Sequence, residues 1–198
     1  MISIPDILDL QKSKVEDWHI NFQLTSDNLP WKFIEENHQW NFSLWHEEDI
    51  ARIKDIDPLR IMQAKRNIDV FNQSRNNAME KIDEWILNYL KFNKIESQGA
   101  LHSETPGMMI DRLSIMSLKR FHMKEETIRD GATEEHKGIC LAKLQILDEQ
   151  IKDLSICLEN IISKLETGEI SFKVYRQMKM YNDPSLNPQL YKRVSTPT

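Results

Sequence analysis

The sequence predicts an all-α protein, and three observations lead to this class. The chain of 198 residues contains five glycines, and stretches that alternate apolar and polar residues, as strands do, are scarce. Two long segments instead repeat apolar residues at spacings of three and four, the period of a helix that packs along one face. Asp57-Pro58 and Thr105-Pro106 are also typical helix starts. We therefore expect a single-domain, mainly antiparallel bundle of four to five long helices over residues 1–180.

Turn residues between the apolar repeats separate the expected helices. Asp27 to Pro30, Asp55 to Pro58, Asp130-Gly131 and Thr167-Gly168 are typical of turns and helix ends. The expected long helices cover about residues 5–18, 31–53, 58–92, 106–128 and 133–165. A short helix over about residues 171–178 follows. Residues 181–198 are rich in Asn and Pro, and we expect them to form a turn-rich tail that is extended or disordered.

The two strongest apolar repeats lie in the third and fifth expected helices. The repeat from Ile61 to Tyr89 has Arg75 as its single charged member. A charge on a buried face costs several kcal/mol unless it is paired. We therefore expect Arg75 to pair with Asp49 or Asp111, or else to bind an anionic ligand. The repeat over residues 140–165 predicts a core seam or a homodimer interface.

Composition argues against several classes of protein. The net charge of −5 argues against a nucleic-acid-binding protein, which usually has a basic surface. No run of 18 apolar residues is present, so we expect no membrane span, and the first residues do not resemble a secretory signal. Cys140 and Cys157 match no zinc-binding spacing. We interpret both as reduced core thiols of a cytoplasmic protein.

Polar residues of a specialised kind lie beside the apolar faces of the second, third and fourth expected helices. They mix His, amide, acid and Arg side chains, whereas solvated helix faces usually carry Glu and Lys. Helical bundles build ligand sites from facing helices, and Arg binds phosphate groups through paired donors. The candidate pocket residues are His38, Asn41, Asp49, Arg52, Asn72, Arg75, Asn76, Asp111, Arg112 and His122. The alternative is that these stripes are solvated outer faces.

A metal site is a second interpretation of the same helices. Glu48, Asp49, Glu80 and Asp83 are carboxylates that could hold Mg²⁺ or Mn²⁺ for the hydrolysis of a nucleotide or another phosphoester. None of these four carboxylates belongs to a Glu-x-x-His motif, and the sequence has no His-Glu-x-x-His motif. His46 lies on a different part of its helix from Glu48, so we expect it to be a surface or packing residue.

Several blocks of the chain resemble a known bacterial family. They are Leu44 to Arg52, Ile68 to Asn76, Glu104 to Gly107 with Ile110 to Ile115, and Tyr175 to Pro184. In this order they are similar to the family called domain of unknown function 4254, over roughly residues 35–190. Asn77 departs from the pattern, because an acidic residue is expected after the Arg-Asn pair.

The resemblance carries an expectation about function. Members of that family often lie beside genes for sugar transferases of surface-polysaccharide assembly. This context implies an accessory or enzymatic role in assembling a surface glycan of the lipopolysaccharide type, with a phosphorylated or sugar-bearing ligand. The resemblance assigns no catalytic residue. A structural interaction module without catalysis remains a further alternative.

Overall fold

The computed structural model describes residues 2–97 and 99–194, the last two of these by their backbone alone. Its helices are α1 (Ile4–Trp18), α2 (Trp31–Ile50), α3 (Pro58–Phe92), α4 (Pro106–Ile128), α5 (Glu134–Glu166) and α6 (Pro188–Val194), with a 3-10 turn η1 (Met180–Asn182). Two short strands, β1 (Ala100–Leu101) and β2 (Ile170–Ser171), pair in parallel. The predicted all-α helical bundle is confirmed.

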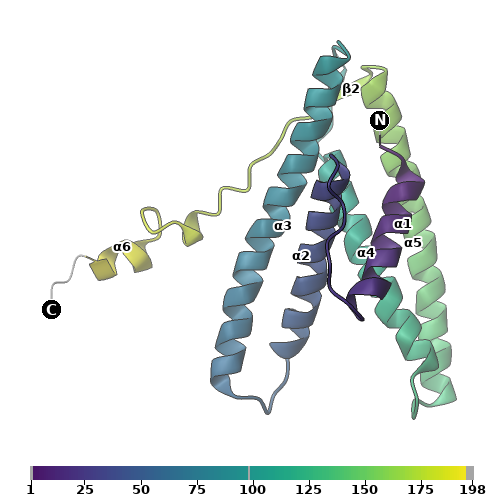
Figure 1. The fold of residues 1–198 in the computed structure, drawn as a ribbon, viewed down its shortest axis with the longest axis vertical. Helices are drawn as coiled ribbons and strands as arrows, with labels where there is room; N and C mark the ends of the chain where they lie inside the picture. Colours follow the sequence, from purple (N-terminus) through teal and green to yellow (C-terminus); the bar gives the residue numbers. More distant parts are fainter. Residues whose placement is uncertain (1, 98, 195–198) are drawn as a thin grey trace.

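The long helices form two antiparallel hairpins, α2–α3 and α4–α5, with α1 packed mainly against α4 (Figure 1). Helices α1, α2 and α4 run in one direction, and α3 and α5 run in the other. The hairpins lie close together beside the two strands and diverge toward their loops. Residues near the C-terminal ends of α1, α2 and α4 therefore meet at the same, diverging end of the bundle.

Capping residues explain why the helices begin where they do. Asp57 accepts a hydrogen bond from the Leu59 N–H at 3.0 Å, and Thr105 accepts one from the Met108 N–H at 3.2 Å. Each cap is followed by Pro, which begins the helix without leaving an N–H unpaired. Helix α2 ends at Ile50, three residues before the expected end. Beyond it, the N–H of Ile53 donates a hydrogen bond to the Ile50 carbonyl oxygen in a turn.

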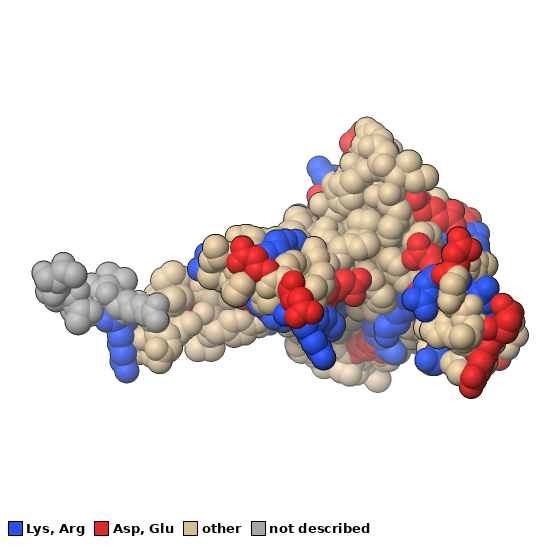
Figure 2. All heavy atoms as spheres, turned by 90° about the horizontal axis from the view of Figure 1, so that it is seen from below, with Lys and Arg blue, Asp and Glu red and all other residues tan. Residues whose placement is uncertain are grey.

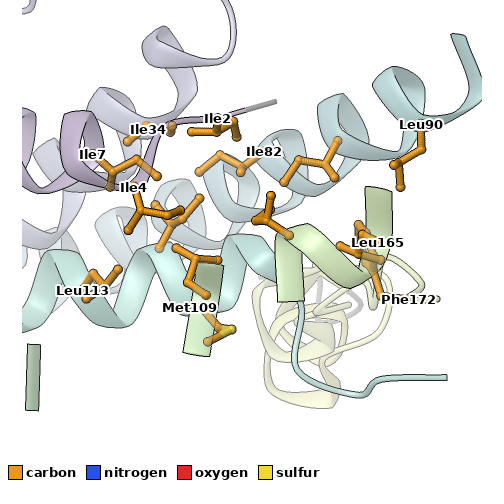
Figure 3. Packing of buried hydrophobic residues seen from close by; sticks show 14 residues of the cluster. Ile2, Ile4, Ile7, Ile34, Ile82, Leu90, Met109, Leu113, Leu165 and Phe172 are labelled. Atoms are coloured by element: carbon orange, nitrogen blue, oxygen red, sulfur yellow. The ribbon is translucent and has the colours of Figure 1, made fainter. Parts of the chain in front are cut away.

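The hydrophobic core lies where the five long helices meet (Figure 3). Ile7, Ile34, Ile82, Ile110 and Leu158, one from each helix, are 0% exposed. Burying one such side chain contributes roughly 1.5–3 kcal/mol to folding. Since the C-terminal part of the α5 repeat packs into this core within the same chain, the repeat does not by itself require a second copy. No helix among the described residues is both long and apolar enough to cross a membrane.

Two other details of the sequence prediction are also wrong. Cys140 is buried as expected, but Cys157 is exposed, because neighbouring helix positions differ by about 100° and the adjacent Leu158 takes the inward one. The expected helix over residues 171–178 does not form. Ser171 belongs to β2, and the following chain is irregular where Arg176 pairs with Glu80 and Glu84 of α3. The tail beyond it contains η1 and α6 and extends away from the bundle (Figure 1).

Helix α4 begins in close contact with α3. A Cβ on Gly107 would lie 2.6 Å from the Met79 carbonyl oxygen and 2.8 Å from Asp83 Oδ1, so no larger residue fits without a shift. This approach lets buried Asp83 accept a hydrogen bond from the Gly107 N–H at 2.7 Å. Burial nevertheless raises the pKa of Asp83 to about 6, against the opposing effect of its hydrogen bonds with Thr105 and Gly107.

The Asp83→Asn variant should gain stability relative to the unchanged protein as the pH rises. The folded-state pKa of Asp83 lies above its unfolded value of 3.8, so the unchanged protein loses stability between about pH 4 and pH 6. The difference between the two proteins should therefore shift by about 2–3 kcal/mol between pH 4 and pH 7. Urea unfolding at both pH values measures it. Asp69→Asn, at an exposed acid of α3, is the control for the general effect of removing one acidic side chain. A stability difference for Asp83→Asn that does not change with pH would contradict the assignment.

Candidate functional site

A buried carboxylate, Asp111, is the centre of a hydrogen-bond network between α2, α3 and α4. It is 2% exposed. Its Oδ1 accepts from Arg75 Nε at 2.7 Å, and its Oδ2 accepts from Arg75 Nη2 at 2.5 Å. The side-chain amides of Asn37 and Asn41 each donate to Oδ1 at 2.9 Å. The charge of Asp111 is thus balanced by a paired Arg interaction and by two further donors.

The local sequence explains this convergence. Asn37 and Asn41 are one helical turn apart, so both amides point to the same side of α2. Arg75 lies on the inward repeat of α3, and its pairing with Asp111 is one of the two that the sequence predicts. The other candidate, Asp49, is exposed. Hydrogen bonding to Asp111 raises the pKa of Arg75 despite burial, so the guanidinium remains charged.

His38 and Ser114 extend the network away from Asp111. The Nδ1 of His38 lies 2.7 Å from Ser114 Oγ, which also accepts from the Asn41 amide at 3.0 Å. His38 is 0% exposed, and burial lowers its pKa to about 3, opposed by the Gln11 backbone and by the charge of Glu35. The ring is therefore neutral near pH 7. This favours a positioning role for His38 over proton transfer.

A pocket of about 330 Å³ opens over this network. Its polar lining consists of Asn41, Glu48, Asp49, Arg52, Asn72 and Arg75, and its apolar lining of Leu44, Trp45, Ile115 and Leu118. The side chain of Arg75 is 25% exposed, so it contacts the buried carboxylate and also lines the pocket. Arg52 is held at the rim by Glu48, with Nη1 and Oε2 2.6 Å apart.

The structure brings most of the predicted pocket residues together. Asn41, Asp49, Arg52, Asn72 and Arg75 line the pocket, and His38 and Asp111 belong to the network that adjoins it.

Three predicted residues lie elsewhere. Asn76 is half-buried on α3, one turn beyond Asn72, and does not line the pocket. Arg112 pairs with Glu104 at 2.5 Å and lines a different hollow, between α4 and α5. His122 stacks on Trp45, with ring centres 4.8 Å apart, and lines a second hollow rather than this pocket.

The four carboxylates of the metal interpretation are not brought together. Because α2 and α3 are antiparallel, Glu47 contacts Arg60 and Asn67, whereas Glu36 contacts Lys81. Glu48 and Asp49 therefore lie near one end of α3, and Glu80 and Asp83 lie roughly 20 Å farther along it at 1.5 Å per residue. Among the described residues, these acids form no common group that could hold an ion.

Sequence reasoning missed Asn37, Ser114 and Trp45. Asn37 could have been found, because it lies one turn before Asn41 on the polar side of the same helix. Ser114 carries no such signal, since a single Ser inside a helix is common. Trp45 gives no such signal either, because nothing in the sequence shows that its ring lines a pocket.

The surface around the diverging end carries both signs of charge. Figure 2, which views the molecule from that end, shows acidic and basic side chains interspersed on this face. The pocket has the same mixed character, since its lining includes two Arg and two acidic side chains. Such a site suits a ligand that combines an anionic group with hydrogen-bonding groups better than it suits a simple anion.

Comparison with known proteins gives a family without an assigned activity. No curated protein and no solved structure is significantly similar to this chain. The family described as "Protein of unknown function (DUF4254)" matches residues 31–174. The match contains α2 to α5 and the whole pocket, and it ends before the Tyr175–Pro184 block. The chain belongs to the DUF4254 family.

Proposed function

We propose that this protein binds a phosphorylated or sugar-bearing small molecule in the pocket between α2, α3 and α4. The observation that supports it is that Arg75 contacts the buried Asp111 and also lines the pocket. Its Nε and Nη2 bond to Asp111, and among the described residues Nη1 has no hydrogen-bond partner. Asp111 therefore fixes the guanidinium through two of its nitrogens, and Nη1 is available to donate to a ligand in the pocket that Arg75 lines. An anionic group can be bound there by a preorganised charge.

The rest of the lining fits a ligand with both an anionic group and hydroxyls. Arg52 adds a second cation at the rim, while Asp49 accepts and Asn72 both donates and accepts hydrogen bonds. Trp45 offers an apolar ring against which a sugar could pack. A sugar phosphate or nucleotide sugar combines these groups, whereas inorganic phosphate would meet repulsion from Glu48 and Asp49.

We further propose that this binding serves surface-glycan assembly in the cytoplasm. The position of family members beside genes for sugar transferases supports a role in this pathway. The two free thiols, Cys140 and Cys157, agree with a reducing compartment. The geometry supports binding more strongly than catalysis, because His38 beneath the pocket is neutral and has no solvent exposure. We therefore favour an accessory, ligand-binding role over an enzymatic one.

A thermal-shift screen tests the proposal with inorganic phosphate, sugar phosphates, nucleotide sugars and Mg²⁺ or Mn²⁺ alone. A ligand that binds the folded state should stabilise it by about 2.7 kcal/mol at a hundredfold excess over its Kd. We expect nucleotide sugars or sugar phosphates to stabilise the folded protein, and inorganic phosphate to stabilise it only weakly. Stabilisation by Mg²⁺ or Mn²⁺ alone would favour the metal-dependent hydrolase. If no compound in the screen stabilises the protein, the interaction module without a ligand is the better description.

Replacing Arg52 should weaken ligand binding without unfolding the protein. Its side chain is 69% exposed, so Arg52→Ala should change stability by no more than about 0.5 kcal/mol. Losing a charged hydrogen bond should raise the Kd about tenfold to a hundredfold, as measured by isothermal titration. Arg112→Ala is the matched control, because Arg112 is also exposed and paired but lies outside the pocket. Equal effects of the two variants would reject the pocket.

A further inference from the structure

Three histidines from three different helices meet at the diverging end of the bundle. His19 follows the last residue of α1, His46 lies on α2 and His122 lies on α4. One ring nitrogen from each lies within 4.8 Å of the other two. The ring centres are 5.2 Å apart for His19–His46 and His19–His122, and 5.7 Å apart for His46–His122. This juxtaposition follows from the common direction of α1, α2 and α4.

The arrangement of the rings is close to that around a tetrahedral metal ion. With metal–nitrogen distances of about 2.0–2.1 Å, three ligand nitrogens lie about 3.3 Å apart and the ring centres about 5 Å apart. The rings of the three histidines are inclined to one another by 71° to 84°, so no two of them stack face to face. Small side-chain rotations would bring the nitrogens from their present separation to the metal-bound one.

Hydrogen bonds outside the group orient two of the three rings. The Nδ1 of His19 lies 2.6 Å from the Val15 carbonyl oxygen, and the Nδ1 of His122 lies 2.7 Å from Glu125 Oε2. Both oxygens accept, so in the neutral imidazole each Nδ1 carries the proton and each Nε2 keeps a lone pair. Metal-binding histidines are usually held in this way by a carbonyl or carboxylate.

The Nε2 of His122 is a second, independent indication. It is buried and has no hydrogen-bond partner among the described residues. A buried polar atom without a partner is costly and calls for an explanation such as an ion. His19 is exposed, so an ion can enter from solvent.

We propose that His19, His46 and His122 bind a divalent transition-metal ion of the zinc class, leaving a fourth position for water or another ligand. Neutral imidazole ligands favour Zn²⁺, Co²⁺, Ni²⁺ or Cu²⁺ over Mg²⁺ and Ca²⁺. The ion joins α1, α2 and α4 where the hairpins diverge. The site is separate from the proposed ligand pocket, although Trp45 stacks on His122 and also lines that pocket.

Two other features of the chain shape the test. Phe121 stacks on His19 with ring centres 4.5 Å apart, so aromatic packing alone is the alternative account of the cluster. A second group of possible ligands, Glu126, His136 and Cys140, lies on α4 and α5. There the same His136 Nε2 already contacts Glu126 Oε2 at 2.7 Å and Cys140 Sγ at 3.4 Å. An experiment must therefore separate this group from the three histidines.

The test is a titration of the metal-free full chain with Zn²⁺ and Co²⁺. We expect about one ion per chain, and a loss of affinity of at least about a hundredfold in His46→Ala and His122→Ala. His19→Ala should give the same loss, and since His19 is exposed this variant keeps the test valid if the others unfold. His136→Ala is the control and should bind normally. The cobalt spectrum should lack a thiolate charge-transfer band.

Each other outcome overturns the proposal. Unchanged affinity in folded His19→Ala and His46→Ala rejects the three-histidine site, and a loss in His136→Ala with a thiolate band assigns the ion to the Cys140 group. No binding at micromolar metal leaves aromatic packing as the account of the cluster.

Glu125→Gln tests the orienting hydrogen bond and should weaken metal binding about tenfold to a hundredfold. Because the readout is metal affinity, failure of the proposed ligand pocket would leave this result unaffected.

Discussion

Arg75→Ala should lower the free energy of unfolding by about 3–5 kcal/mol. The substitution removes both guanidinium hydrogen bonds to Asp111. Asp111 remains 2% exposed, and the amides of Asn37 and Asn41 cannot neutralise its charge. The cost is therefore mainly that of an uncompensated buried carboxylate. Urea denaturation at pH 7 measures it.

Arg60→Ala is the matched control for this prediction. Arg60 also lies on α3 and also donates through two nitrogens to one carboxylate, that of Glu47. Its side chain is 36% exposed, so water can replace the lost partner and the change should cost about 1 kcal/mol or less. Similar small losses in both variants would contradict the structural role of Arg75. If Arg75→Ala keeps its stability but loses ligand binding, Arg75 serves mainly the ligand.

A lysine at this position separates charge from geometry. Arg75→Lys keeps a positive charge near Asp111 but loses the planar pair of donors. Its stability should lie between those of Arg75→Ala and the unchanged protein. Ligand binding should fall by more than stability does, because the single ammonium nitrogen that bonds to Asp111 cannot present a second, fixed nitrogen to the pocket as the planar guanidinium does.

The fold could be predicted largely because the signals are local. Asp57-Pro58 and Thr105-Pro106 contain a cap and a helix-starting Pro, so the starts of α3 and α4 match the structure to the residue. The α2 end has no Gly or Pro, and the prediction there is three residues too long. Residues 171–178 have helical composition, but the pairing of β2 with β1 and the contacts of Arg176 with Glu80 and Glu84 override it.

The candidate site could be predicted only in part, because it depends on which helices face one another. A charged residue on an apolar repeat indicates burial, and Arg75 is indeed bound to Asp111. A helical wheel does not show which helix lies beside it. The sequence prediction therefore places Arg112 and His122 with residues that they do not contact. His19, His46 and His122 share no sequence spacing, and only the parallel course of three helices brings them together.

A second buried charge, on Glu35, anchors the segment that joins α1 to α2. Glu35 is 1% exposed and lies 2.8 Å from the ammonium group of Lys14. Its carboxylate also accepts from the N–H of Thr25 at 3.1 Å and of Ser26 at 2.6 Å. One side chain of α2 therefore satisfies the backbone of the connecting segment and a cation of α1.

Glu35→Ala should consequently destabilise the protein by about 3–5 kcal/mol, because it leaves two N–H groups and Lys14 without their acceptor. Lys14→Met should cost less, since Glu35 then keeps both N–H donors.

Burial would raise the pKa of Glu35, but Lys14 and the hydrogen bonds from Ser26 and Thr25 lower it below its usual value. The stabilisation by the Glu35 charge is therefore fully present above about pH 4.5 and disappears as the pH falls through the lowered pKa. Urea unfolding of the unchanged protein and of Glu35→Gln, from pH 7 downward, should show a difference that shrinks below that value. A difference that grows in acid would reverse the assigned direction of the pKa shift.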